Sequence, residues 1–264
     1  RTAITFDAEK EVYDLLYNHF RTQSKQELFN HIHCDTWMIL PEGFMPKTTD
    51  AKTDEKENIW GCKYTQAHYS GGYYDEISFN PLAGKNELSD IDTWQAPGRD
   101  QLSFDHFVTE ANDNSDRAII GVFTHGAYFI GTDVRGLENL MMDFYDHPLF
   151  VCDLLNTIAD YNIAQAKEAI NNYDIDAVYF GDDWGQQHGL LMGPEAWHSF
   201  IYPVLKRMYA AVREADPGMP FQVMKVSLAP DGGVGSTSEW SGRLLFFPIH
   251  AVVTRTEYVP NERI

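Results

Sequence analysis

Two adjacent carboxylates directly follow an apolar run of the sequence, and they are the residues best suited to chemistry. Asp182 and Asp183 come after Ile175–Phe180, within the segment Gly181-Asp182-Asp183-Trp184-Gly185-Gln186-Gln187. Adjacent side chains at a strand end point to different sides, so only one carboxylate need face a site. In surroundings poor in water such a group can exchange a proton, and it could also bind a metal or a cationic substrate. The alternative is a turn aspartate that caps a helix or pairs with an arginine.

A second group of candidate residues follows the β-rich run Ala118–Phe123. His125 could be a general base, a metal ligand, a hydrogen-bond donor to a substrate, or a satisfied loop histidine. Tyr128 and Trp184 could wall an apolar pocket, although aromatic residues at such positions more often serve packing. We predict catalytic roles for Asp182, Asp183 and His125. Substrate contacts are predicted for five further residues: Tyr128, Trp184, Gln186, Gln187 and His188. Of these, His188 is further from its strand, and a structural role is the alternative for it.

Composition and absent motifs exclude several classes of function. The net charge of −19 over 264 residues disfavours nucleic acid as a partner, because phosphate binding needs a basic surface. No window approaches the ~20 apolar residues of a membrane helix. Cys34, Cys62 and Cys152 lie far apart, which argues against a disulfide scaffold and for a cytoplasmic location. No phosphate-binding glycine loop, no G-x-S-x-G elbow and no HExxH motif is present.

The elements that must position these residues alternate between strands and helices. Helices are expected over residues 7–20, from Ser24, over 134–144, over 148–171 and from Pro194 to about 212. Buried strands are expected over residues 35–40, 118–123, 175–180 and 221–226, and a hairpin pairs 58–64 with 73–79. Residues 90–94 are expected to form one helical turn. Apolar strands that alternate with helices indicate a parallel sheet covered on both faces, with functional residues at its carboxyl ends.

Three stretches of the sequence resemble the uroporphyrinogen decarboxylase superfamily. Their features are the acidic glycine loop after a strand, the helix start Gly193-Pro194-Glu195 and the helix centre Pro203-Val204-Leu205-Lys206-Arg207. Gly71-Gly72-Tyr73-Tyr74, Pro81-Leu82-Ala83 and residues 119–140 are similar as well. The resemblance runs from about residue 10 to about 225. It implies a (β/α)8 TIM barrel, and the Asp182 loop is similar to the divergent branch of corrinoid-dependent methyltransferases.

The chain also departs from the family pattern. True decarboxylases carry an arginine-rich stretch near the N-terminus that binds substrate carboxylates, whereas Arg1 and Arg21 are isolated here. No Asp ends the first strand. The methyltransferase branch has a His-x-Cys zinc motif after the strand equivalent to 221–226, but this chain has Met224-Lys225-Val226-Ser227-Leu228-Ala229. We therefore assign no metal ligands and no covalently bound cofactor.

Residues 226–264 match nothing in the family pattern, and only four barrel strands precede them. We therefore interpret residues 1–225 as the N-terminal part of one barrel domain, truncated to about half, followed by a truncated or frame-altered tail.

The resemblance implies a methyltransferase that moves a methyl group between a small methylated substrate and a corrinoid protein or thiol. The first alternative is a uroporphyrinogen decarboxylase, a lyase of porphyrin biosynthesis that acts on a tetrapyrrole. The second is a non-catalytic fragment that binds a corrinoid or a partner protein.

Overall fold

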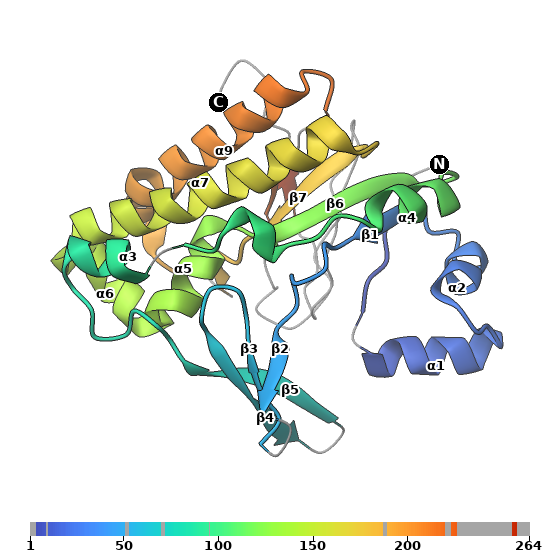
Figure 1. The fold of residues 1–264 in the computed structure, drawn as a ribbon, viewed down its shortest axis with the longest axis horizontal. Helices are drawn as coiled ribbons and strands as arrows, with labels where there is room; N and C mark the ends of the chain where they lie inside the picture. Colours follow the sequence, from blue (N-terminus) through green and yellow to red (C-terminus); the bar gives the residue numbers. More distant parts are fainter. Residues whose placement is uncertain are drawn as a thin grey trace.

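The computed structural model describes residues 4–8, 10–50, 53–69, 72–94, 96–186, 189–219, 223–225 and 255–257. Helices and strands alternate along most of this length (Figure 1). Within it, no helix is both long and apolar enough to cross a bilayer. Cys34, Cys62 and Cys152 are free thiols.

A parallel sheet lies at the centre of the structure, as the sequence predicts. Its order is β1 (Thr36–Ile39), β6 (Ala118–His125) and β7 (Ala177–Gly181), and both pairings are parallel. The register of β6 against β7 shifts between Val122 and Thr124, which brings His125 opposite Gly181. All three carboxyl ends therefore lie at one edge of the sheet, where the candidate residues were expected.

The two faces of this sheet bury different side chains, because successive residues of a strand point to opposite sides. Ile39 and Ile119 join the main core with helix α7 (Pro148–Asn172), whose Leu154 and Ile158 are fully buried. Met38, Ile120 and Val122 form a second apolar cluster. Helix α9 (Tyr202–Ala215) packs along α7, and the two helices run side by side in Figure 1.

Two of the predicted helices are divided where a local feature interrupts them. Residues 134–144 fall on two helices, α5 (Ala127–Arg135) and α6 (Leu137–Asp146), because Gly136 has a φ of 86° and ends α5. The predicted helix from Pro194 consists of α8 (Gly193–Ala196), a π-helical segment (Trp197–Ile201) and α9. A π segment leaves local hydrogen bonds irregular and often lies near functional sites.

The N-terminal elements confirm most of the expected pattern. α1 (Lys10–Phe20) precedes α2 (Lys25–His31), whose N-cap Ser24 accepts a hydrogen bond from the Glu27 amide at 3.2 Å. Buried Leu28 and Phe29 anchor α2. The predicted turn over residues 90–94 is α3 (Leu88–Trp94). A 3-10 turn (Arg99–Gln101) and α4 (Phe107–Asp113) lead into β6.

A separate antiparallel sheet projects from this body (Figure 1). Its order is β2 (Lys47–Asp50), β3 (Glu55–Glu57), β4 (Lys63–Tyr69) and β5 (Gly72–Phe79). The predicted hairpin is present, but its first strand begins at Lys63 because Asn58 folds the preceding residues into a turn. The Asn58 Oδ1 atom accepts hydrogen bonds from the amides of Trp60 and Cys62, both at 3.0 Å.

The expected barrel strand over residues 221–226 is not a parallel strand in the described part of the chain. Val223–Lys225 forms β10, which pairs antiparallel with β11 (Arg255–Glu257). The described parallel sheet therefore has three strands. The α/β class with a parallel sheet is confirmed, and the division into a half barrel and a tail stays a prediction.

Candidate functional site

Asp182 lies at the carboxyl end of β7 and caps helix α5 from outside that helix. Its Oδ1 atom accepts a hydrogen bond from the Phe129 amide at 2.7 Å. The N-cap residue of α5 is Gly126, which has no side chain to supply a cap. A carboxylate near a helix N-terminus satisfies a free amide and interacts favourably with the helix dipole. The helix-capping alternative therefore holds for Asp182, although the helix lies before it in sequence.

Gly126 allows this contact because it lacks a Cβ atom. A Cβ built on Gly126 would lie 2.1 Å from the Asp182 Cγ atom, far inside van der Waals contact. The Gly126 amide donates to the Gly181 carbonyl oxygen at 2.6 Å, which fixes the two chain segments against each other. The feature that could have identified Gly126 from the sequence is its position between the end of β6 and the start of α5.

Asn162 supports the same edge of the sheet from α7. It is fully buried, and its Nδ2 atom donates to the His125 carbonyl oxygen at 3.0 Å. A buried polar side chain requires such a partner, because an unpaired polar group in the core costs about 1–3 kcal/mol. Asn162 was not among the predicted residues, although its position on the buried side of a long apolar helix could have identified it.

Burial raises the pKa of the Asp182 carboxyl group from 3.8 to about 7. Desolvation is the largest cause, and Asp183 adds a smaller effect in the same direction. The amides of Phe129 and Tyr128 and the indole of Trp184 oppose the rise. The residue keeps some exposed surface, but its Oδ2 atom is buried and has no hydrogen-bond partner among the described residues. Asp182 therefore holds a proton about half of the time near neutral pH.

His125 lies beside two aromatic rings at the end of β6. Its ring centroid is 4.4 Å from that of Phe129 and 5.4 Å from that of Phe44. Desolvation lowers the pKa of His125 to about 4. The residue as a whole is exposed, so water still reaches part of it and moderates this effect. Both observations leave the imidazole neutral at pH 7.

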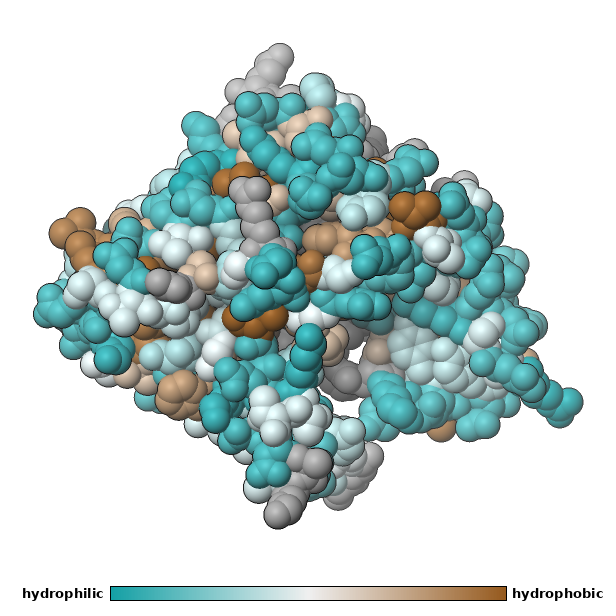
Figure 2. Space-filling view, viewed as in Figure 1, coloured by the Kyte–Doolittle hydropathy of each residue, from teal (hydrophilic) through white to brown (hydrophobic). Residues whose placement is uncertain are grey.

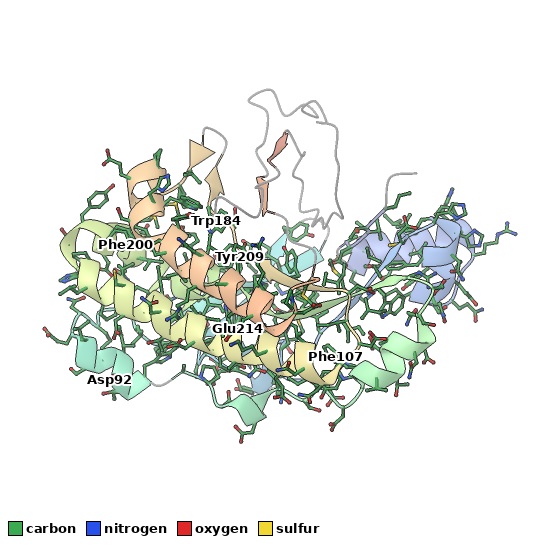
Figure 3. All side chains as sticks on the ribbon, turned by 90° about the horizontal axis from the view of Figure 1, so that it is seen from above. Asp92, Phe107, Trp184, Phe200, Tyr209 and Glu214 are labelled. Atoms are coloured by element: carbon green, nitrogen blue, oxygen red, sulfur yellow. The ribbon has the colours of Figure 1, made fainter. Side chains whose placement is uncertain are left out.

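Three other predicted residues, Asp183, Tyr128 and Trp184, have described surroundings. Asp183 is exposed, and its Oδ1 atom accepts a hydrogen bond from the Gly185 amide at 3.4 Å. Tyr128 is 2% exposed, and the two carboxylates raise the pKa of its hydroxyl beyond the rise caused by burial. Trp184 packs edge-on against Trp197 at 5.7 Å. In Figure 3, Trp184 and Tyr209 lie in the same part of the molecule, whereas Phe107 lies toward the other end of the sheet.

For the other three residues that were predicted to contact a substrate, the structure gives little information or none. Gln186 lies in β8 (Gly185–Gln186), which pairs with β9 (Gly189–Leu190). Gln187 and His188 lie outside the described residues. Their predicted substrate contacts stay predictions.

Buried polar atoms without partners gather around this edge of the sheet. Among the described side chains they include the Asp182 Oδ2 atom and, in its neighbourhood, the Trp184 Nε1 and Tyr128 hydroxyl atoms. Two more are the Nε1 atom of Trp197, which packs on Trp184, and the Oδ1 atom of Asn162, whose Nδ2 binds the His125 carbonyl oxygen. The Trp184 indole is close enough to affect the Asp182 carboxyl, but the two atoms do not complete a hydrogen bond of normal geometry. Buried groups of this kind are ordinarily satisfied, so a set of them marks a place where a ligand can supply the missing bonds.

The described part of the site contains carboxylates and neutral groups. The arginines with described ion pairs bind elsewhere: Arg117 contacts Asp116, Arg135 contacts Asp143, and Arg207 contacts Asp160. Over the described ranges, no described arginine or lysine contacts Asp182, Asp183 or His125. No set of three or more His, Cys, Asp and Glu side chains is arranged for a metal there either. The expectation that the chain has no metal ligands stays a prediction.

An open groove of about 420 Å³ lies on the outer side of α7, away from this site. Its lining is charged and polar: Asp160, Ile163, Ala164, Lys167, Glu168 and Asn171. These residues lie in the half of α7 that leads to the amino end of β7. The groove therefore lies away from the edge where the candidate residues meet.

Comparisons with known proteins give a family match and a similar solved structure. Residues 118–226, which contain every predicted site residue, match the sequence model of the family described as "Uroporphyrinogen decarboxylase (URO-D)". A solved structure described as "methyltransferase from Methanosarcina mazei" is similar with a TM-score of 0.50 and 13% identity, over 80% of this chain and 61% of that one. At this identity the likeness concerns the fold alone, and this chain spans less than two thirds of that structure's length. No curated protein matches the chain. The resemblance read from the sequence is confirmed over residues 118–226, which match the uroporphyrinogen decarboxylase family model, and the fold is similar to that of a solved structure described as a methyltransferase.

Proposed function

We propose that the chain is a methyltransferase that moves a methyl group between a small methylated substrate and a corrinoid protein or a thiol. The observation that carries the proposal is Asp182, a carboxyl group with a pKa of about 7 and one buried, unpartnered oxygen atom. A group whose pKa is near the working pH is best suited to general acid–base catalysis.

Each residue has a role in this reaction. For a donor R–X–CH3, the acceptor supplies the electron pair of the new bond to the methyl carbon. The C–X bond breaks, its electron pair stays on X, and the protonated Asp182 gives its proton to X. His125, which is neutral at pH 7, accepts or donates a hydrogen bond, and Asp183 holds the negative charge of the site.

The charge of the site supports methyl transfer over uroporphyrinogen decarboxylation. A tetrapyrrole with many carboxylates needs cationic partners, preferably arginines. The free amides at the start of α5 would attract an anion, but the Asp182 carboxyl group already occupies that position. Unchanged uroporphyrinogen after anaerobic incubation with the chain is the expected result, and product formation would favour the decarboxylase.

A methyl-transfer assay tests the proposal. The chain is incubated with reduced cobalamin and with deuterated-methyl ethers, amines and thioethers, and the label on cobalamin is measured by mass spectrometry. We expect label transfer that depends on the chain and falls by about 100-fold or more in Asp182→Asn. Absence of transfer from every donor would overturn the proposal and favour a non-catalytic protein that binds a corrinoid, which shifts in the visible absorption of added cobalamin would reveal.

A further inference from the structure

The site combines aromatic faces with carboxylates at the same edge of the sheet. Phe44, His125 and Phe129 form a continuous row of rings, with centroid separations of 5.4 Å and 4.4 Å. The backbone amide of Phe129 is the one that binds the Asp182 carboxyl group at 2.7 Å. Phe44 and Phe129 are both half-buried.

The charges around these rings favour a cation. Near neutral pH the site contains two carboxyl groups, that of exposed Asp183 and that of Asp182, whose pKa burial raises to about 7. His125 adds no positive charge at that pH. Asp182 also covers the start of α5, which removes the free amides that would otherwise repel a cation.

From this juxtaposition we infer that the substrate of the site is a small methylated onium cation, a quaternary ammonium or sulfonium, held on the Phe44–His125–Phe129 rings beside Asp183. The inference rests on the proposed methyl transfer and names the class of its donor. Aromatic faces bind methylated cations through the negative face of the ring, and a nearby carboxylate adds a Coulombic attraction. Loss of a methyl group leaves the electron pair of the broken bond on nitrogen or sulfur. An amine product then takes the Asp182 proton on that electron pair, whereas a thioether leaves as a neutral product and Asp182 keeps its proton.

The buried polar atoms supply a second, independent reason to place a ligand here. The hydroxyl of Tyr128, which is 2% exposed, has no partner among the described residues and lies close enough to Asp182 and Asp183 to feel both charges. The Trp184 indole nitrogen is also buried and unpartnered. These two groups can bind the polar end of a substrate whose onium end faces the rings.

Binding of a matched pair of ligands tests the inference. Choline and 3,3-dimethylbutan-1-ol have the same shape and differ in the charge of the head group. We expect choline to bind at least about tenfold more tightly in isothermal titration calorimetry. Trimethylsulfonium, as a third arm, tells whether the site accepts sulfonium as well as ammonium. Equal affinity for the charged and neutral ligands, or no choline binding, would overturn the inference.

Two pairs of variants place the binding at this site. Asp183→Asn is matched by Asp92→Asn, which removes the same charge from exposed Asp92 of α3, apart from Trp184 (Figure 3). Phe129→Leu is matched by Phe79→Leu, whose ring is 50% exposed on β5. We expect choline to bind about tenfold more weakly to Asp183→Asn and Phe129→Leu. The choline affinity of the two control variants should be unchanged. Circular dichroism confirms that each variant is folded, and equal effects in both members of a pair would overturn the assignment.

The two proposals fail in different ways. Methyl transfer from ethers or thioethers without choline binding would reject the onium substrate and leave the methyltransferase in place. Choline binding without methyl transfer from any donor would reject the methyltransferase and leave a site that binds onium cations.

Discussion

Two buried carboxyl groups lie at opposite ends of helix α5, and only one of them has an unpartnered oxygen. Burial raises the pKa of Asp182, at the start of the helix, and of Asp133, near its end, to about 7 in each case. The Oδ2 atom of Asp133 accepts the Tyr64 hydroxyl at 3.3 Å, and Tyr64 in turn accepts the Asn58 amide at 2.8 Å. The Oδ2 atom of Asp182 is buried and has no described partner. A raised pKa therefore does not by itself mark a functional residue.

The surroundings of the two carboxyl groups explain the difference in role. The Asp133 network joins α5 to the antiparallel sheet through Tyr64 of β4, and Asn80 strengthens it by donating to the Asp133 carbonyl oxygen at 2.6 Å. Asp182 is followed by exposed Asp183, and the Tyr128 hydroxyl and the Trp184 indole nitrogen in its neighbourhood have no described partner. We interpret Asp133 as a structural carboxyl that connects two parts of the fold and Asp182 as a carboxyl that meets a substrate.

Replacement of each carboxyl by its amide gives the largest expected contrast. Asp182→Asn removes the proton donor and should lower methyl transfer by about 100-fold or more, the usual size of a general acid–base contribution. Asp133→Asn should change transfer by less than about twofold, because Asp133 contacts no group at the sheet edge. The rates are measured with the same labelled donor. A similar loss in both variants would show that the two carboxyls do not differ in role.

Gly126→Ala should displace Asp182 without altering any titratable group. Its Cβ would overlap the Asp182 Cγ atom, and such overpacking typically costs about 1–3 kcal/mol. We expect this loss in the free energy of unfolding from urea titrations, together with reduced methyl transfer. Gly218→Ala is the control, because its nearest atom beyond its own neighbours is the Asp216 Oδ1 at 3.3 Å. Unchanged stability in Gly126→Ala would mean that Asp182 does not lie against this glycine.

The stability of the folded chain should fall as the pH rises from about 4 to about 7. Both carboxyls have a pKa near 3.8 when unfolded and about 7 when folded, so the folded state binds more protons in this range. Each carboxyl should contribute on the order of 2–4 kcal/mol to this loss, which is complete above pH 7. Besides burial, the groups that shift the pKa of Asp182 are the amides of Phe129 and Tyr128, the Trp184 indole and Asp183, and the group that shifts the pKa of Asp133 is the Tyr64 hydroxyl.

Urea titrations at several pH values measure the slope of the free energy of unfolding against pH. Asp182→Asn and Asp133→Asn should each remove about half of it, and the double variant most of it. A slope that is the same in all four proteins would contradict the raised pKa values.

Tyr64→Phe should have the smallest effect and should act on Asp133 alone. Loss of the hydroxyl removes its hydrogen bonds with Asp133 and Asn58, each worth about 0.5–1.5 kcal/mol. Because the hydrogen bond with Asp133 lowers the pKa of that carboxyl, its loss should raise the pKa further and destabilise the chain more at pH 8 than at pH 5. Methyl transfer should be unchanged. Reduced transfer with unchanged stability would instead connect the antiparallel sheet to the site.

The location of the site could be predicted from the sequence, but the details of Asp182 could not. The apolar run before Asp182 and the break after residue 123 indicated two strand ends at one edge of a parallel sheet, and both lie there. The contact with Gly126 depends on two segments more than fifty residues apart, so no local pattern contains it. The same holds for Asn162, whose partner is a backbone carbonyl on β6.

The predictions that were wrong depended on local interruptions or distant pairing. Gly136 adopts a positive φ that ends α5, and a single glycine within a helical pattern is compatible with continuation as well as with a break. The strand over residues 221–226 has an apolar pattern suited to a buried parallel strand, but its described partner is β11. A strand pattern does not specify the partner strand or its direction. Figure 2 shows a largely hydrophilic surface with separate apolar patches.

The most direct test of the proposed role of Asp182 is its own titration. Carbon-13 NMR of the aspartate side-chain carboxyl carbons, recorded from pH 3 to 9, follows each carboxyl, and Asp182→Asn and Asp133→Asn assign the two signals. We predict two carboxyls with midpoints of about 7, of which only that of Asp182 moves when a methyl donor binds. An Asp182 midpoint near 4, or a midpoint that no donor changes, would contradict the role of Asp182 as the proton-exchanging group of the site.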